Sequence, residues 1–269
     1  MSSNIDPKLV ALDIDGTLVT YDEVLSDAAR DAVAAVRAAG HHVVLASGRS
    51  LIAMTPIAAE LKIEESWIVA SNGAVTARLD TTADMGYTLE RVETFDPQPV
   101  LRMLKEELPH ARYAVEDIGV GFRMTELFPD GELNGEHRVV DFEQLWAGHV
   151  TRVVVRSPGE TSAEFHEIAA RLGFDDVTYA VGWSAWMDIA PQGVTKASAL
   201  EEVRKELGIA AEDTVAVGDG SNDIDMLRWA ARGVAMGHAS DTVRSAADEV
   251  TGSIDDDGVV EVLKSLLRG

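Results

Sequence analysis

The stretch that decides the fold runs from Lys8 to Leu18 and reads KLVALDIDGTL. Its first part, Leu9–Leu12, is wholly apolar, which is typical of a strand buried on both faces of a parallel sheet. Asp13 and Asp15 end that strand, and Gly16 permits the sharp turn by which the chain leaves the sheet. Two carboxylates at alternate positions of an extended chain point to the same side, about 6.5–7 Å apart. The stretch therefore predicts a buried strand with a pair of acids at its carboxyl end.

Such a pair of acids repels itself unless something positive lies nearby. Two like charges 4 Å apart repel by about 4 kcal/mol at an effective dielectric constant of about 20. A bound divalent cation relieves the repulsion, and oxygen ligands of this kind favour magnesium. The alternative is an Asp-Gly turn at the surface that binds nothing, so further motifs have to decide between the two.

The composition limits the class of protein. The chain has 269 residues, 46% of them hydrophobic, which is enough for one large domain or two smaller ones. It has no cysteine, which excludes disulfides and thiolate metal sites. Its net charge of −23 repels nucleic acid and anionic membranes, so neither is expected as a partner. The polar residues 1–8 and the lack of a membrane-length apolar run lead us to expect a soluble cytoplasmic protein.

Strands alternate with helices towards both ends of the chain, a pattern that predicts a right-handed, doubly wound α/β sheet. The expected N-terminal elements are a helix over 26–39, a strand over 42–46, a helix from 50 that Pro56 kinks or restarts, and a strand over 67–70. The expected C-terminal elements are a helix from 195, a strand over 214–217, a helix from 222, a strand over 233–235 and a helix over 258–267.

The middle of the chain has a different pattern of apolar and polar residues from about Thr82 onwards. Its expected strands are amphipathic and come in pairs, 112–115 with 119–123 and 177–181 with 186–189, as in an antiparallel sheet. Helices are expected over 99–108, 141–146 and 162–172. The predicted fold is α/β, with a mostly parallel Rossmann-like core sheet over residues 1–82 and 188–269 and an inserted α+β domain over residues 83–187.

Three further segments place polar residues where core strands end or core helices begin. They read ASGR at 46–49, PQGVTK at 191–196 and GDGSND at 218–223. Because sites in open α/β sheets form at the carboxyl ends of the strands, these segments can converge on Asp13. Each is weak by itself, but GDGSND gathers acids and an amide around two glycines, which is costly without an ion. Together they favour one shared site over coincidence.

These segments resemble the motifs of haloacid dehalogenase-like phosphatases of the Cof type, and the resemblance covers nearly the whole chain. DIDGTL at 13–18 matches the first motif, ASGR the second, Lys196 the third and GDGSND the fourth. The insert lies where that family carries its cap domain. Departures from the family pattern occur at Ala197, His238 and Ile254, and none of them removes a catalytic group.

The resemblance implies a role for each acid. Asp13 would be the nucleophile that attacks phosphorus and gives an aspartyl-phosphate. Asp15, oriented by Thr17, would protonate the leaving alkoxide and then activate water. Magnesium would be held by Asp13, the backbone carbonyl of Asp15 and Asp219, with Asp223 closing or supporting that shell.

The remaining motif residues would hold the phosphoryl group. Ser47, the backbone of Gly48, Lys196 and Asn222 would donate hydrogen bonds to its oxygens. The metal and Lys196 would supply positive potential inside an acidic protein. The implied substrate is a small phosphorylated metabolite, with sugar phosphates first and cofactor phosphates behind them.

Residues outside the four motifs leave alternatives open. Arg49 pairs either with a substrate anion or with a nearby carboxylate. Asn72 either faces the site or only forms an Asn-Gly turn. Trp183 and Trp186 either stack on a sugar or pack in the core.

Other functions share some of these parts. A phosphomutase has the same core but returns the phosphoryl group to a sugar. A receiver-type phosphoacceptor domain also combines acids, a hydroxyl and a lysine on a doubly wound sheet, but it is about half this length and has no large insert. A relative without catalysis would act as a binding protein. The sequence leaves the oligomeric state open.

Overall fold

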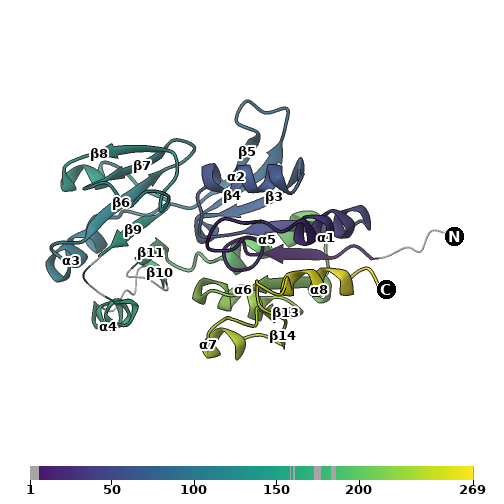
Figure 1. Ribbon diagram of the computed structural model, residues 1–269. Helices are drawn as coiled ribbons and strands as arrows, with labels where there is room; N and C mark the ends of the chain where they lie inside the picture. Colours follow the sequence, from purple (N-terminus) through teal and green to yellow (C-terminus); the bar gives the residue numbers. More distant parts are fainter. Residues whose placement is uncertain (1–5, 158, 160, 173–176, 183–185, 269) are drawn as a thin grey trace.

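The computed structural model describes residues 6–157, 159, 161–172, 177–182 and 186–268. Figure 1 shows two parts: a core that holds the first and last described elements, β1 and α8, and a cap formed by the middle of the chain. The predicted α/β core with an inserted α+β domain is confirmed.

The core is built on an eight-stranded sheet with the order β14-β13-β12-β1-β2-β3-β4-β5. All neighbouring strands from β14 to β3 run parallel, and β4 and β5 form an antiparallel edge. The strand that carries the first acids, β1, therefore lies between β12 and β2. The core strands are β1 (Leu9–Leu12), β2 (His42–Ala46), β3 (Glu65–Ala70), β4 (Val75–Asp80), β5 (Tyr87–Val92), β12 (Thr214–Gly218), β13 (Arg232–Ala235) and β14 (Glu249–Val250).

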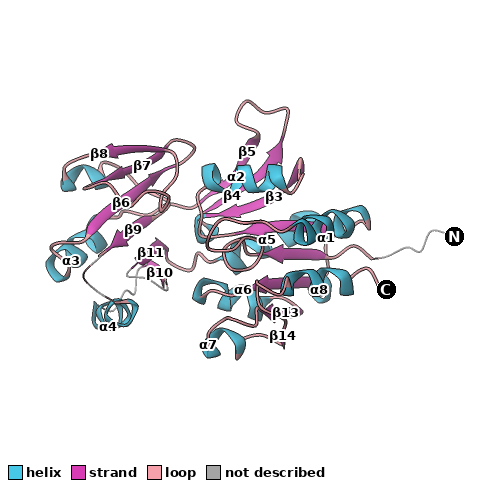
Figure 2. Ribbon diagram, in the orientation of Figure 1, coloured by secondary structure: helices cyan, strands magenta, loops and turns pink. Residues whose placement is uncertain are grey.

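Helices cover both faces of this sheet (Figure 2). Val10 and Leu12 of β1 pack into a cluster with α1, α2 and α8. Leu9 and Ala11, which alternate with them, pack into a second cluster with α5, α6 and α7. This explains why β1 is apolar at every position. The core helices are α1 (Asp27–Ala38), α2 (Leu51–Glu60), α5 (Lys196–Leu207), α6 (Ile224–Trp229), α7 (Asp241–Arg244) and α8 (Gly258–Ser265), with 3₁₀ turns η1 (Ser71–Gly73), η3 (Ala211–Asp213) and η4 (Ser221–Asp223).

The cap is a six-stranded sheet with the order β10-β11-β9-β6-β7-β8. Both predicted hairpins form, and among the described strand pairs of the cap only β7 and β8 run parallel. The predicted helix over 141–146 is a 3₁₀ helix. The cap elements are α3 (Gln98–Glu107), β6 (Arg112–Asp117), β7 (Gly121–Met124), β8 (Glu136–Val139), η2 (Phe142–Trp146), β9 (Val153–Arg156), α4 (Ser162–Leu172), β10 (Val177–Val181) and β11 (Trp186–Pro191).

The sheet topology favours domain boundaries other than the two expected ones. The boundary expected after residue 82 falls between β4 and β5, which both belong to the core sheet. β5 is a mostly exposed edge strand, so it lacks the apolar run of a buried parallel strand. The boundary expected after residue 187 falls inside β11, a cap strand. We propose that the cap spans residues 93–191.

The helix α2 continues through Pro56. Of the two outcomes expected at this proline, a kink or a restart, the restart does not occur. Proline lacks the N–H that would bond the carbonyl of Ile52 one turn earlier. The hydroxyl of Thr55 donates to that carbonyl instead, at 3.5 Å. The helix therefore continues to Glu60 with this carbonyl paired.

Candidate active site

The predicted motifs meet at the carboxyl edge of the core sheet. Asp13 follows β1 and Asp219 follows β12, and the two strands are in register, with Leu12 opposite Val217. The Asp13 N–H extends this ladder by donating to the Val217 carbonyl at 3.0 Å. Ser47 follows the neighbouring strand β2. The parallel topology thus brings the ends of distant segments together, as the sequence predicts.

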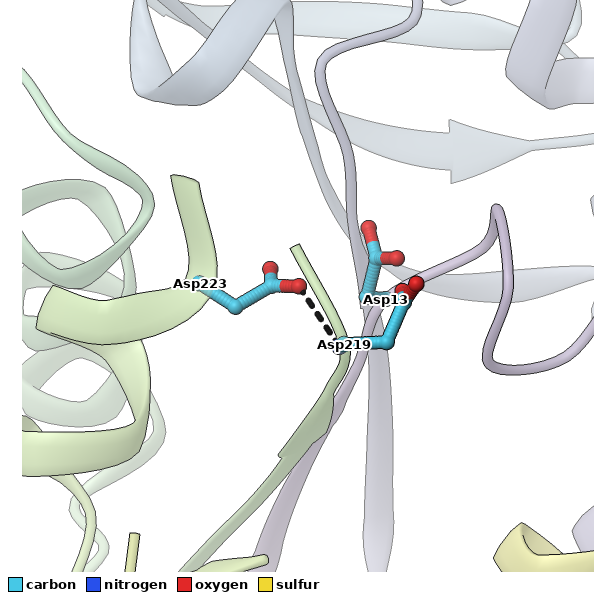
Figure 3. Close-up of side chains that lie close together, drawn as sticks. All are labelled: Asp13, Asp219 and Asp223. Atoms are coloured by element: carbon cyan, nitrogen blue, oxygen red, sulfur yellow. Dashed lines mark hydrogen bonds between the residues drawn. The ribbon is translucent and has the colours of Figure 1, made fainter. Parts of the chain in front are cut away.

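Three buried acids form the centre of the site (Figure 3). Asp13, Asp219 and Asp223 each offer a carboxylate oxygen, and these oxygens lie within 4.8 Å of one another. The exposed fractions of these residues are 5%, 9% and 0%. The Asp223 Oδ2 accepts hydrogen bonds from the N–H groups of Asp219 (3.0 Å) and Gly220 (2.8 Å), so the turn after β12 fixes its position.

Gly16 lets the first motif approach these acids. Its φ of +73° lies in the left-handed region that favours glycine. A Cβ at this position would lie 2.3 Å from Asp219 Oδ2. A side chain here would push Asp219 away, so the glycine serves the close approach as well as the turn.

Lys196 provides the positive charge that the three acids need. Its Nζ donates to Asp13 Oδ1 and to Asp223 Oδ1, each at 2.6 Å, and the residue is 1% exposed. Thr195 caps the helix that presents it, since its side chain accepts from the Ser198 N–H. One ammonium group therefore faces three carboxylates.

The pKa values of these groups reflect the excess of carboxylates over positive charge in the site. Burial, and then repulsion by Asp223, holds the pKa of Asp13 well above its usual range, although Lys196 opposes the rise. Burial and Asp223 likewise raise the pKa of Asp219. For Lys196, burial acts to lower the pKa, but attraction by Asp13 and Asp223 outweighs it and the pKa rises. The site favours additional positive charge.

We expect the metal-free protein to lose stability as the pH rises. Acids whose pKa is raised on folding stabilise the native state below their unfolded pKa near 4, and this contribution is lost as the pH rises through the folded pKa. Urea denaturation in chelator between about pH 5 and pH 7 measures the slope. The slope should be shallower in Asp13→Asn, and an unchanged slope in that variant would contradict the assignment to these acids.

Asp219 has further partners on the core. Tyr21 donates its hydroxyl to Asp219 Oδ2 at 2.7 Å, and His238 Nε2 lies 3.4 Å from the same oxygen. Burial, and then the charge of Asp219, raises the pKa of Tyr21. Thr17 Oγ1 donates to Asp219 Oδ1 at 3.4 Å, whereas we expected it to orient Asp15. Tyr21 carries no motif signal, and the sequence analysis did not find it.

Asp15 is paired with Arg49. The guanidinium donates from Nε to Asp15 Oδ2 (2.9 Å) and from Nη2 to Oδ1 (2.6 Å). The same Nη2 donates to Glu23 at 2.8 Å. Of the two alternatives for Arg49, the structure shows the carboxylate pairing. A cavity of about 370 Å³ lies beside this pair, between the 19–25 loop, α2 and residues 134–135 of the cap.

The predicted phosphate-binding residues lie together next to the acids. Asn222 Nδ2 donates to Asn72 Oδ1 at 2.9 Å. A Cβ on Gly48 would lie 3.2 Å from that oxygen and 3.6 Å from Asn222 Nδ2, so the three residues adjoin. Ser47 is 1% exposed, and its Oγ accepts from the Arg49 N–H at 3.1 Å. Trp183 lies outside the described residues.

The sequence analysis missed a buried charged cluster in the cap. Arg152 donates from Nη1 to the Gly48 carbonyl of the core, and the same nitrogen lies 3.4 Å from Asp188 Oδ1. Its Nε lies 3.7 Å from Glu116 Oε2, and that oxygen accepts from the hydroxyl of Ser71 in the core at 2.6 Å. Burial raises the pKa of Asp188, and Arg152 opposes the rise. These residues follow no motif spacing, so no sequence signal marks them.

No helix within the described part of the chain is long and apolar enough to cross a membrane.

Comparison with known proteins identifies the family. The chain is 28% identical to the 5-amino-6-(5-phospho-D-ribitylamino)uracil phosphatase YcsE of Bacillus subtilis, over 97% of this chain and 96% of that protein. It is 29% identical to the pyridoxal phosphate phosphatase YbhA of Escherichia coli, over 97% and 98%. The solved structure of the HAD subclass IIB sugar phosphatase BT4131 aligns with a TM-score of 0.80 and 25% identity, over 96% of this chain and 98% of that one. The family model for haloacid dehalogenase-like hydrolases matches residues 10–263, and the chain belongs to this family.

Proposed function

We propose that the protein is a magnesium-dependent phosphatase that hydrolyses a phosphomonoester of a small metabolite through an aspartyl-phosphate. The observation that carries the proposal is the cluster of Asp13, Asp219 and Asp223 around a single buried lysine. A site with this excess of negative charge suits a bound cation. The cation and Lys196 together would hold a phosphoryl group. The family and its phosphatase relatives support the same class of reaction.

The residues present fit a magnesium ion. All three acids offer oxygen, the ligand atom that magnesium prefers. Lys196 occupies Asp13 Oδ1, which leaves Oδ2 of that residue for a metal. The oxygens of Asp219 accept from Thr17 and Tyr21, but a carboxylate has about four acceptor sites and can also bind a metal. The backbone carbonyl of Asp15 and the side chain of Asp223 would complete the protein ligands. When bound, the ion would neutralise charge on the phosphoryl oxygens.

In this mechanism Asp13 attacks phosphorus, because its backbone is held at the end of β1 and its carboxylate is held by Lys196. Ser47, the Gly48 N–H, Lys196 and Asn222 would bind the phosphoryl oxygens and hold the group in line. Asp15 would protonate the leaving oxygen and then activate water. To do so it must leave Arg49, and Glu23 is placed to keep the guanidinium when that happens.

Removal of the metal tests the proposal. We expect chelation to lower the rate of p-nitrophenyl phosphate hydrolysis by at least about 10²-fold, because the charge stabilisation supplied by the ion is worth several kcal/mol. Excess magnesium should restore the rate and raise the melting temperature, since it binds the folded state. Full activity in chelator would exclude the metal role.

The substrate class needs a separate experiment. Relatives are named for a sugar phosphate, for pyridoxal phosphate and for a ribitylaminouracil phosphate. We propose a sugar phosphate first, and a panel of phosphorylated metabolites that includes all three classes measures the preference. Release of inorganic phosphate from a hexose phosphate favours hydrolysis, whereas an isomeric hexose phosphate as product indicates a phosphomutase. A stable phosphoprotein without turnover indicates a phosphoacceptor.

A further inference from the structure

We propose that Arg152 is a positioning residue through which the cap orients the phosphate-binding loop of the core. The inference rests on the proposed phosphatase function and adds a residue outside its four motifs. Arg152 precedes β9 in the cap and is 4% exposed. Its guanidinium crosses to the core and donates to the carbonyl of Gly48, in the loop that would bind the phosphoryl group.

The cap holds this guanidinium from several sides. Asp188 of β11 and Glu116 of β6 place carboxylate oxygens 3.4 Å from Nη1 and 3.7 Å from Nε. The ring of Phe122 lies beneath the guanidinium carbon, 5.3 Å from its centroid. Trp186 in turn donates to Asp188 Oδ2 at 2.9 Å. The arginine is therefore fixed relative to the cap sheet before it reaches the core.

The bond to Gly48 acts on the hydroxyl of Ser47 through one peptide group. The Gly48 carbonyl and the Arg49 N–H belong to the same peptide, and that N–H donates to Ser47 Oγ. Because this oxygen accepts, the hydroxyl keeps its own hydrogen for another acceptor, and within the described residues it donates to none. When both the carbonyl and the N–H of a peptide group are hydrogen-bonded, the two bonds strengthen each other and fix the orientation of the group. Arg152 thus sets the direction in which Ser47 can donate to a phosphoryl oxygen.

The cap also contacts two other loops of the site. Ser71, which follows β3, donates to Glu116 of the cap at 2.6 Å. Ser221, in the fourth motif, donates to the carbonyl of Val181 in β10 at 3.1 Å. The position of Arg152 over Gly48 therefore depends on how the whole cap sits on the core. A cap displaced from this position would lose the bond to Gly48, so phosphoryl binding and cap docking are coupled.

Arg152→Lys is the most informative variant. It keeps a positive charge between Glu116 and Asp188, so the fold is retained, but it lacks the planar fork that reaches Gly48. We expect kcat for p-nitrophenyl phosphate to fall by about 10²-fold, the loss typical of a misplacement of about 1 Å. Affinity for inorganic phosphate, measured by calorimetry on the magnesium-loaded protein, should fall as well. Arg123→Lys, which alters an arginine paired with Asp117 on the same cap sheet, should change neither.

Two further variants keep the result interpretable. Arg152→Ala opens space for free guanidinium, and millimolar guanidinium should restore part of kcat, which a merely structural role would not allow. If that variant fails to fold, Arg152→Met with Glu116→Gln and Asp188→Asn removes the buried charges together. This triple variant should fold, and its kcat should stay low. Wild-type rates and phosphate affinity in Arg152→Lys would overturn the proposal. A wild type that hydrolyses no phosphomonoester would instead refute the phosphatase function, while phosphate binding would still test Arg152.

Discussion

Asp13→Asn is expected to abolish hydrolysis of p-nitrophenyl phosphate and, in the same protein, to stabilise the metal-free fold. An amide cannot attack phosphorus, so we expect the rate to fall by at least about 10⁴-fold, the scale seen when a nucleophile is removed. The neutral amide still accepts a hydrogen bond from Lys196, which keeps the local geometry. The two effects have opposite signs because function requires a charge that the fold tolerates poorly.

The gain in stability follows from the electrostatics of the site. Asp13 is buried, and its pKa is raised by burial and by Asp223 more than Lys196 lowers it. An ionised Asp13 therefore costs native-state free energy at neutral pH, and a neutral residue of the same shape removes that cost. After the substitution, Lys196 faces two acids in place of three.

Asp213→Asn is the matched control. Asp213 pairs with Lys8 at 2.6 Å. These residues directly precede β12 and β1, so the pair lies at the amino ends of the strands, away from the site. The control should keep full activity and change stability by less than about 1 kcal/mol, because the pair is partly exposed. Urea denaturation in chelator measures the change in stability, and phosphate release measures the change in rate. Turnover in Asp13→Asn would remove this residue from its role, and a loss of stability would mean that its charge is already compensated.

The sequence predicts the site because parallel topology leaves few alternatives. A short apolar run that ends in acids is typical of a central strand, and the carboxyl ends of its parallel neighbours lie on the same side of the sheet. That is why Asp13, Ser47 and Asp219 could be grouped although more than 200 residues separate the first from the last. The start of α5 joins them because Thr195 is a clear cap directly before Lys196.

The parts that the sequence did not predict depend on which side chain reaches which partner. Spacing puts Asp15 on the same side as Asp13, but it leaves open whether Arg49 pairs with a carboxylate or with a substrate anion. The pairing that the structure shows joins residues 34 positions apart, and no local signal marks it. The cap cluster is harder still, because Arg152 and Gly48 meet only when two domains dock. The edge strand β5 looked like part of the insert because exposed antiparallel strands follow the same alternation in either domain.

Lys196→Met is expected to have the opposite effect on stability from Asp13→Asn. It removes the ammonium group that bonds Asp13 and Asp223, each at 2.6 Å, and leaves these two buried carboxylates without that cationic partner. Breaking a buried pair in this way costs about 3–5 kcal/mol of unfolding free energy. The rate should fall by at least about 10²-fold, because a donor to the transferring phosphoryl group is lost. Lys8→Met, the lysine of the surface pair with Asp213, should change stability by less than about 1 kcal/mol and leave the rate unchanged.

The pH dependence and the double variant separate a lost charge from lost packing. Without Lys196 the pKa of Asp13 rises further, so the deficit in unfolding free energy should be small below the unfolded pKa near 4 and grow as the pH rises. A packing defect would cost the same at every pH. Asp13→Asn combined with Lys196→Met should recover part of the stability but none of the activity, because the two groups share one electrostatic interaction and act in one reaction. Additive free energies in that double variant would show that the lysine and the aspartate do not depend on each other.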